Sequence, residues 1–347
     1  MLRLHSSRLP SLRYDGGMRA VLPMLLLLGA SAYAAGSLNI YLIDVEGGQS
    51  TLVVSPSGQS LLIDAGYAGF GGRDADRIKT AAKAAGVKHI DYLLVTHFHS
   101  DHVGGVPELL QRLRVANILD YGPSVDAGGK YPADYAAAVA KIAHHIVAAP
   151  GDKIPVKGLD ITVVAAAGKT IQRPLARAGT PNPYCDGVAA HRGVDETGEN
   201  PQAVGVVIEL GKFRFGDFSD ITWNKELALL CPENKAGKLD LYLTTHHGGE
   251  SSKAIWGLAP RVAIMNNGPN KGGDPAGWKV VKASPGLEDL WQLHFAMAGG
   301  SVTNVAESFI ANVDNDPGEY LKVTAEASGA FTVTNHRNGF SKTYPTK

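Results

Sequence analysis

Three histidines and an aspartate fall within six residues of the stretch VTHFHSDHVGG, and this crowding constrains the fold more than any other feature of the chain. The preceding residues, 89–95, have the composition of a buried strand, so the cluster begins where a strand ends. Because His97 and His99 are two residues apart on chain leaving that strand, their side chains point the same way. Asp101 and His102 follow one tight turn later. Imidazoles and carboxylates are donors that zinc prefers, so the stretch predicts a metal site.

Four donors in six residues cannot all reach one ion without strain, because Asp101 and His102 diverge from the first pair. We therefore expect two ions a few ångströms apart, one bound by His97 and His99 and the other by Asp101 and His102. Histidine at position 99 favours zinc, since a carboxylate there would favour iron.

Short apolar runs and helical patterns alternate along the rest of the chain. Strands are predicted at 38–45, 50–56, 60–66, 158–167, 203–217, 239–246 and 261–268, and helices at 74–87, 107–115, 131–148, 221–231 and 286–297. From Asn312 onward, the turns Ser328-Gly329 and Asn338-Gly339 separate strand-like runs, which predicts a small antiparallel appendage. This interleaving predicts an α/β fold of layered sheets with helices outside.

The first 34 residues differ from the rest. After Met18, a second candidate start, Arg19 precedes an apolar run and the small-residue triplet that ends at Ala34. This pattern predicts a signal peptide over residues 1–34, and hence a secreted or periplasmic protein. The apolar run is shorter than the roughly 20 residues that a membrane span needs, and no span is predicted after it.

The charge of the remaining chain argues against a nucleic-acid scaffold. Removing the leader takes four of the 33 Lys and Arg residues and one of the 33 Asp and Glu residues, which leaves a net charge of 29 − 32 = −3. No basic surplus remains to hold a polyphosphate backbone, so no strong nucleic-acid-binding surface is expected.

The chain has only two cysteines, Cys185 and Cys231. They lack the Cys-x-x-Cys spacing of a metal knuckle. They form either one disulfide or two separate buried thiols, and both alternatives stay open.

The segment THFHSDHVGG matches the His-x-His-x-Asp-His signature of the metallo-β-lactamase superfamily. In order along the chain, DVEGGQS (44–50), LIDAG (62–66), FGDFSD (215–220) and TTHHGGESS (244–252) resemble one branch, the extracytoplasmic domain of DNA-uptake competence proteins. The resemblance implies an αββα sandwich over residues 35–310, with metals at one edge between the two sheets. The small C-terminal antiparallel β appendage would then occupy residues 311–347.

The resemblance also implies the remaining metal ligands. Asp217, at the end of KFRFGD, corresponds to the carboxylate that bridges the two metals. His246, at the end of the strand LDLYLTTH, would complete the second site with Asp101 and His102. The adjacent His247 is then expected to hydrogen-bond a substrate or to protonate a leaving group.

The first site needs a third donor. Many family members supply a histidine from the loop before the strand that leads into Gly-Asp, but here Asn200 and Gln202 stand in that loop. His191 is the nearest histidine upstream, so all three residues remain alternatives.

Other positions are expected to tune the site. Asp64 and Asp44 would either orient ligands or loops through hydrogen bonds or cap turns, and both alternatives stay open. In NNGPNKGGDP, Asp274 stands where the branch has a histidine, and a carboxylate there would disfavour anionic substrates unless a cation intervenes.

Two zinc ions that share a water would hold a hydroxide ready, with Asp101 orienting it and accepting its proton. The resemblance therefore implies an exported zinc-dependent hydrolase acting on a phosphodiester, either a small molecule or a polymer such as a nucleic acid or an envelope polymer. One alternative is a lactone or amide hydrolase, β-lactams included, for which Lys253 is the cation expected near the last ligand. Another is a non-catalytic metal-binding scaffold domain.

Overall fold

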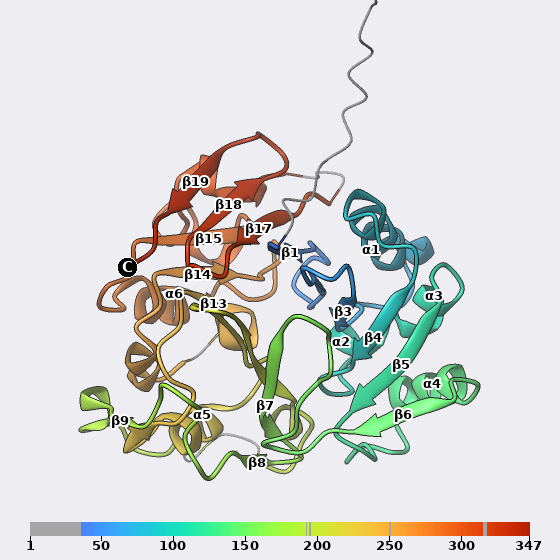
Figure 1. The fold of residues 1–347 in the computed structure, drawn as a ribbon, viewed down its shortest axis with the longest axis horizontal. Helices are drawn as coiled ribbons and strands as arrows, with labels where there is room; N and C mark the ends of the chain where they lie inside the picture. The colour runs from blue at the N-terminus through green and yellow to red at the C-terminus, as the bar shows by residue number, and fades with distance from the viewer. Residues whose placement is uncertain (1–35, 192, 194–195, 250, 315–317) are drawn as a thin grey trace, which may run out of the picture. The chain divides into compact units, whose positions relative to one another are not determined.

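The computed structural model of the protein describes residues 36–191, 193, 196–249, 251–314 and 318–347 (Figure 1). The predicted leader, residues 1–34, lies outside these described residues. The first of two large sheets has nine strands in the order β19-β18-β17-β1-β2-β3-β4-β5-β6. The second has eight in the order β16-β15-β14-β13-β11-β10-β7-β8, and β12 and β9 form a separate pair.

The strands of both sheets are short. In the first sheet they are β1 Leu38–Leu42, β2 Thr51–Val54, β3 Ser60–Ile63, β4 Ile90–Leu94, β5 Val115–Asp120, β6 His144–Val147, β17 Leu321–Ala325, β18 Phe331–Asn335 and β19 Ser341–Tyr344. In the second they are β7 Asp160–Ala166, β8 Lys169–Thr170, β10 Gly205–Leu210, β11 Phe213–Asp217, β13 Leu241–Leu243, β14 Val262–Met265, β15 Asp289–His294 and β16 Ile310–Asn312. The separate pair is β9 Thr180–Pro181 with β12 Glu233–Asn234.

Helices connect the parallel strands and cover the outer faces of the sheets (Figure 1). They are α1 Arg73–Ala84, α2 Ser100–Val103, α3 Val106–Leu110 and α4 Lys130–Val139 with the first sheet, and α5 Trp223–Leu230 and α6 Pro275–Lys282 with the second. Short 3₁₀ turns are η1 Phe70–Gly72, η2 Pro183–Cys185, η3 Asn200–Gln202, η4 Thr245–Gly248, η5 Lys253–Leu258, η6 Met297–Gly299 and η7 Glu307–Phe309. Apolar side chains of both sheets, such as Leu62 and Phe215, share one core. The predicted αββα sandwich is confirmed.

Two helix predictions need correction. The pattern over 131–148 is helical only as far as Val139, because its last residues form β6, which pairs in parallel with β5. The segment predicted as a helix at 286–297 contains β15, which lies between β14 and β16 with Trp291 fully buried. A strand covered on both faces lacks the alternation of polar and apolar residues that distinguishes a strand from a buried helix.

The C-terminal antiparallel strands are present, and they extend the first sheet. Strand β17 pairs antiparallel with β1, and β18 and β19 continue from it as hairpins. The predicted boundary between residues 310 and 311 falls inside β16, which belongs to the second sheet. The described residues from Gly36 onward belong to one compact unit.

Cys185 and Cys231 form a disulfide, which decides between the two alternatives left by the sequence. The bond joins residues 46 positions apart. We expect the double variant Cys185→Ala/Cys231→Ala to lose about 4 kcal/mol of unfolding free energy, the chain-entropy value for a loop of that length. Urea unfolding of the variant and the wild type measures the difference, and coincident midpoints would contradict the expectation.

Candidate metal centre

Chain segments from both sheets meet at one edge of the sandwich. Strand β4 of the first sheet leads into α2, which carries Asp101 and His102. In the second sheet, Asp220 lies in the loop after β11, and His247 lies in η4 after β13. Since β11 and β13 are parallel neighbours, the segments that follow them leave the sheet at the same edge.

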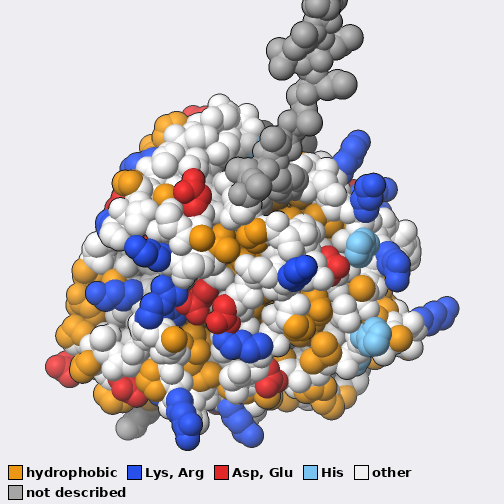
Figure 2. Space-filling view, in the orientation of Figure 1, with side chains coloured by type: hydrophobic (Ala, Val, Ile, Leu, Met, Phe, Trp, Pro, Cys, Tyr) orange, Lys and Arg blue, Asp and Glu red, His pale blue; other side chains and the backbone are white. Residues whose placement is uncertain are grey.

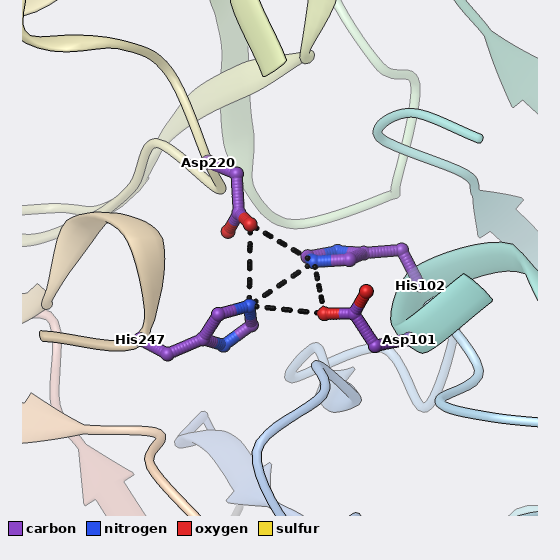
Figure 3. A group of neighbouring side chains, drawn as sticks. All are labelled: Asp101, His102, Asp220 and His247. Carbon is purple, nitrogen blue, oxygen red and sulfur yellow. Dashed lines mark hydrogen bonds and ion pairs between the residues drawn. The ribbon is translucent and has the colours of Figure 1, made fainter. Parts of the chain in front are cut away.

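Asp101, His102, Asp220 and His247 each place one donor atom within 4.8 Å of the other three, and all four side chains are buried (Figure 3). The Nε2 atoms of the two histidines are 3.2 Å apart. Asp101 Oδ2 lies 3.2 Å from each of these nitrogens. Asp220 Oδ2 lies 3.3 Å from that of His102 and 3.2 Å from that of His247. Over the described part of the chain, no other set of His, Cys, Asp or Glu side chains converges in this way.

The spacing of these donors fits a four-coordinate ion. Tetrahedral zinc with bonds of about 2.0–2.1 Å separates its ligand atoms by roughly 3.3 Å. The five donor pairs measured above are 3.2–3.3 Å apart. The residue types and their spacing therefore fit a divalent metal ion such as zinc.

Both imidazoles are oriented through their second ring nitrogen. His102 Nδ1 lies 2.7 Å from Asp64 Oδ2, and Thr96 donates hydrogen bonds to both oxygens of Asp64. The side-chain amide of Asn266 lies 3.2 Å from His247 Nδ1. Such partners hold the ring so that Nε2 faces the metal position. Asp64 thus contacts a ring of the group, as expected of a residue that orients a ligand.

The charges of the four side chains balance one another. Burial disfavours the charged imidazole, yet the carboxylates of Asp220 and Asp101 hold the pKa of His102 well above its usual value. Burial also disfavours the carboxylates, but the two imidazoles hold the pKa of Asp101 and that of Asp220 well below their usual range. Each carboxylate thus favours the protonated form of the imidazoles, so metal binding at Nε2 would displace protons from them.

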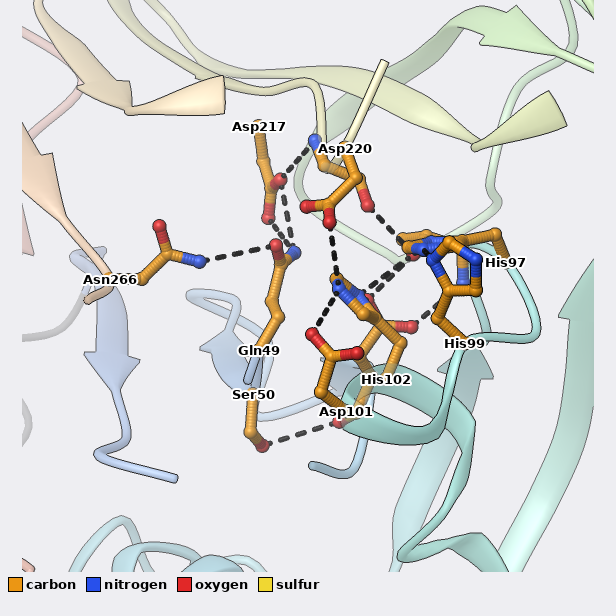
Figure 4. A network of polar contacts seen from close by, with 12 residues as sticks. Gln49, Ser50, His97, His99, Asp101, His102, Asp217, Asp220 and Asn266 are labelled. Carbon is orange, nitrogen blue, oxygen red and sulfur yellow. Dashed lines mark hydrogen bonds and ion pairs between the residues drawn. The ribbon is translucent and has the colours of Figure 1, made fainter. Parts of the chain in front are cut away.

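The carboxylate of this group is Asp220, whereas the sequence had indicated Asp217. Asp217 ends β11, and its carboxylate accepts hydrogen bonds from Gln49 Nε2 at 3.0 and 3.1 Å and from the Ser219 backbone N–H at 3.0 Å (Figure 4). Ser219, with a positive φ of 50°, turns the chain so that Asp220 enters the group. The segment FGDFSD contains a second aspartate, Asp220, which could have been considered as the ligand. Like Asp101, it lies in the segment after a strand rather than at the end of the strand.

The second imidazole is likewise His247 rather than the predicted His246. The strand β13 ends at Leu243, and the tight turn η4 that follows gives both histidines positive φ values of 51° and 55°. The His247 side chain is 1% exposed within the group, whereas that of His246 is 44% exposed, with Nε2 3.7 Å from Asp220 Oδ2. Strand-end position therefore did not decide which histidine faces inward. His247 occupies a ligand position instead of the substrate-facing position expected for it.

His97 and His99 lie next to the group, as the sequence predicted (Figure 4). His97 is fully buried, and its Nε2 lies 3.1 Å from His99 Nδ1. Burial, followed by the charge of His102, holds the pKa of His97 well below its usual value, so the ring is neutral and able to bind a metal.

Of the three alternatives for a third donor, Asn200 lines the same cavity as His99. Its Nδ2 lies 3.4 Å from His246 Nε2, and its Oδ1 is buried without a hydrogen-bond partner among the described residues. His191 packs against Trp223, and Gln202 Nε2 donates to the Gly198 carbonyl. The structure thus favours Asn200 over the other two.

A cavity of about 460 Å³ opens onto the group. Its lining includes His99, Asn200, His246, His247, Lys271 and Asp274. The Lys271 ammonium forms an ion pair with Asp101, so a cation lies directly beside the group and near Asp274. Lys253, the cation indicated by the sequence, lies over the ring of Trp256 instead.

The backbone holds Lys271 close to the metal centre. The Gly273 N–H donates to the His247 carbonyl oxygen at 2.8 Å, and a Cβ at Gly272 would lie 2.3 Å from that oxygen. On the other side, a Cβ at Gly47 would lie 2.8 Å from Lys271 Cβ. Glycine is therefore needed on both sides of this loop for its close approach.

Comparison with known proteins agrees with this picture. Residues 43–194, which include the stretch from His97 to His102, match the family model of the metallo-β-lactamase superfamily. Hydroxyacylglutathione hydrolase of Erwinia tasmaniensis is 38% identical over 79 residues, 23% of this chain and 26% of that protein. Ribonuclease Z of Alkaliphilus oremlandii is 30% identical over 90 residues, 24% of this chain and 26% of that protein. The match thus spans about a quarter of the length of each relative.

One similar solved structure is that of MEM-A1, a subclass B3 metallo-β-lactamase from a soil metagenome library. It is 17% identical, with a TM-score of 0.36, and the match covers 73% of this chain and 84% of that chain. The family match and the buried Asp and His group together support the metallo-β-lactamase superfamily and the class of metal-dependent hydrolases.

Proposed function

We propose that this chain, matched over residues 43–194 to the metallo-β-lactamase superfamily, is a zinc-dependent phosphodiesterase. The observation that carries the proposal is the buried group of Asp101, His102, Asp220 and His247, which faces an open cavity with the Lys271 ammonium at its edge. With one coordination position kept for water, a zinc ion held by these side chains would supply a Lewis acid and an activated water at neutral pH. His97 and His99 would hold a second, weaker ion.

The side chains of this chain would do the remaining work. Asp101 would face the metal through Oδ2, which lies beside both imidazoles and Lys271, and this leaves Oδ1 to orient a water molecule and accept its proton. Lys271 places a fixed positive charge where the negative charge of a phosphodiester binds and grows during attack. That charge also offsets the carboxylate of Asp274 in the same cavity.

The net charge of −3 expected without the leader favours a small phosphodiester over a long nucleic acid. On the face that Figure 2 shows, Lys and Arg side chains are interspersed with acidic and apolar ones and form no continuous basic stripe. A protein that holds a polyphosphate backbone needs such a stripe. One relative is named a ribonuclease, which supports phosphodiester chemistry rather than a polymeric substrate in particular.

We also propose that the protein is exported. The disulfide between Cys185 and Cys231 supports this, since such bonds persist in oxidising compartments. Over the described residues, no helix has the length and apolar character to cross a bilayer.

A substrate panel tests the proposed activity. The zinc-loaded protein is assayed with bis(p-nitrophenyl) phosphate, an uncharged aryl lactone and a chromogenic cephalosporin. We expect diester hydrolysis that is lost on chelation and restored by zinc. Turnover of the lactone or cephalosporin alone would establish the alternative hydrolase instead. A folded protein that binds no zinc would support a scaffold domain.

Lys271→Met is expected to raise KM for the charged diester about 10-fold, because it removes a charge-assisted hydrogen bond. For the uncharged lactone, KM should stay within about twofold, since no anionic group meets the lysine. Lys271→Arg keeps the charge and serves as the matched control. Steady-state kinetics with both substrates, at equal zinc content, decide the question. A similar rise in KM for the diester and the lactone would contradict a role of Lys271 in binding the anion.

A further inference from the structure

A second cavity, of about 620 Å³, lies beside the metal centre between α4, β6 and the segment that follows β5. Most of its lining is apolar and includes Pro123, Ala133, Ala136, Val139 and Ile142. Phe98, between the two predicted ligands His97 and His99, also lines it. The cavity is thus large, apolar and adjacent to the chemistry, and the proposed hydrolysis does not use it.

The one carboxylate in this cavity is fully engaged by its neighbours. Asp120 is 1% exposed and accepts hydrogen bonds from the Gly122 N–H at 2.9 Å and from the Tyr135 hydroxyl at 2.6 Å. His145 Nε2 lies 2.7 Å from the same carboxylate. Because both oxygens have partners, the acid does not require a polar ligand. A cavity of this composition binds apolar groups.

The apolar cavity is linked to the cavity above the metal centre through shared lining residues. A hollow of about 370 Å³ shares Phe98 and Pro132 with the apolar cavity. The same hollow shares His99, Gly198 and Glu199 with the cavity above the metal centre. The three hollows therefore follow one another along the surface.

Glu199 holds Phe98 and Tyr121 in place beside these hollows through hydrogen bonds. Its Oε2 accepts hydrogen bonds from the Phe98 N–H at 2.9 Å and from the Tyr121 hydroxyl at 2.8 Å. Val125 in the connecting hollow and Val147 in the apolar cavity are 52% and 58% exposed. Large apolar side chains exposed beside a preformed cavity are typical of a surface that a ligand covers.

We propose that the apolar cavity binds a hydrophobic ester substituent of the substrate while the phosphodiester lies at the metal centre. The inference rests on the proposed phosphodiesterase activity and narrows its substrates to amphiphilic diesters. Because the apolar cavity lies outside the group that would hold the metal, the substituent would act in substrate selection rather than in the chemical step.

Two diesters that differ in one ester group test this inference. Both carry a p-nitrophenyl leaving group, and the second group is either methyl or dodecyl. Burial of the alkyl chain should make KM of the dodecyl diester about 10-fold or more lower than that of the methyl diester, with kcat similar. The assays stay below the critical micelle concentration of the dodecyl compound.

A matched pair of variants on α4 locates the effect. Ala136→Trp fills the cavity and is expected to abolish the difference between the two diesters without changing KM for the methyl diester. Ala137→Trp is the control, because Ala137 is exposed on the same helix and does not line the cavity. If Ala136→Trp preserved the dodecyl preference, the inference would be overturned.

Binding of the dye N-phenyl-1-naphthylamine to chelator-treated protein gives a readout that needs neither metal nor turnover. We expect fluorescence enhancement with wild type and Ala137→Trp, and at least about fivefold weaker binding with Ala136→Trp. One outcome is that Ala136→Trp loses dye binding while the wild type hydrolyses neither diester. The proposed function would then fail, but binding of apolar groups in the cavity would stand. Hydrolysis of both diesters with equal KM would overturn the inference alone. A dimer in sedimentation that Ala136→Trp dissociates would also overturn it, by assigning the cavity to a second copy.

Discussion

Asp220→Asn is expected to remove tightly bound zinc and to lower kcat/KM for a phosphodiester by about 100-fold or more. Removing a residue that only hydrogen-bonds to a metal ligand already lowers metal affinity or activity 10- to 100-fold. Removing a ligand itself should therefore lower them by at least about 100-fold. Asp220 Oδ2 lies within 3.3 Å of both imidazole nitrogens, so the amide would remove one of the two carboxylates that face them and leave Asp101 alone. Metal analysis after dialysis and steady-state kinetics measure both effects.

Asp217→Asn is the matched control, since it makes the same chemical change three residues away. Its side chain contacts Gln49 and the Ser219 backbone rather than the histidines. We therefore expect the variant to retain tightly bound zinc and to lose no more than about 100-fold in activity, as a positioning residue would. The reverse result, zinc lost in Asp217→Asn and kept in Asp220→Asn, would restore the assignment indicated by the sequence.

His247→Ala is expected to have an effect as large as Asp220→Asn. The substitution removes a buried nitrogen that lies 3.2 Å from His102 Nε2 and from both carboxylates of the group. Zinc affinity should fall by about 100-fold or more, since a direct ligand is lost. Competition with a fluorescent zinc chelator measures the affinity without requiring turnover.

His246→Ala tests the neighbouring histidine in the same assay. This side chain is half-exposed at the cavity wall, so the variant should keep the tight zinc site, with affinity changed by less than about 10-fold. Thermal unfolding of both metal-free variants shows whether either change disturbs the fold. Equal loss of zinc affinity in the two variants would show that the turn η4 rearranges when metal binds.

Much of the fold follows from local pattern. The turns Ser328-Gly329 and Asn338-Gly339 identified the C-terminal strands, and β17 shows the alternating burial of a strand, with Leu321 and Val323 buried and Lys322 less so. Tertiary pairing decided the segments where local pattern was ambiguous. His144–Val147 forms a strand only because β5 offers a neighbouring edge, although the preceding residues favour a helix. The five residues of β15 from Leu290 onward are buried on both faces, so their polar and apolar pattern could not identify a strand.

The sequence by itself determined the chemistry of the first half of the site. Two histidines, an aspartate and a third histidine in six residues leave a strand together, so no tertiary information is needed to bring them close. The sequence also placed Asp64 at the end of a strand, but only the pairing of β3 with β4 brought its carboxylate beside His102.

Only the tertiary structure decided which residues of the second sheet complete the site. Asp217 and Asp220, like His246 and His247, are close in sequence and identical in chemistry, so composition cannot separate them. The choice depends on backbone turns: positive φ at Ser219 and at both histidines rotates one side chain of each pair inward and its neighbour away. Lys271 likewise reaches Asp101 from 170 residues further along the chain, through a glycine loop whose close packing exists only in the folded protein.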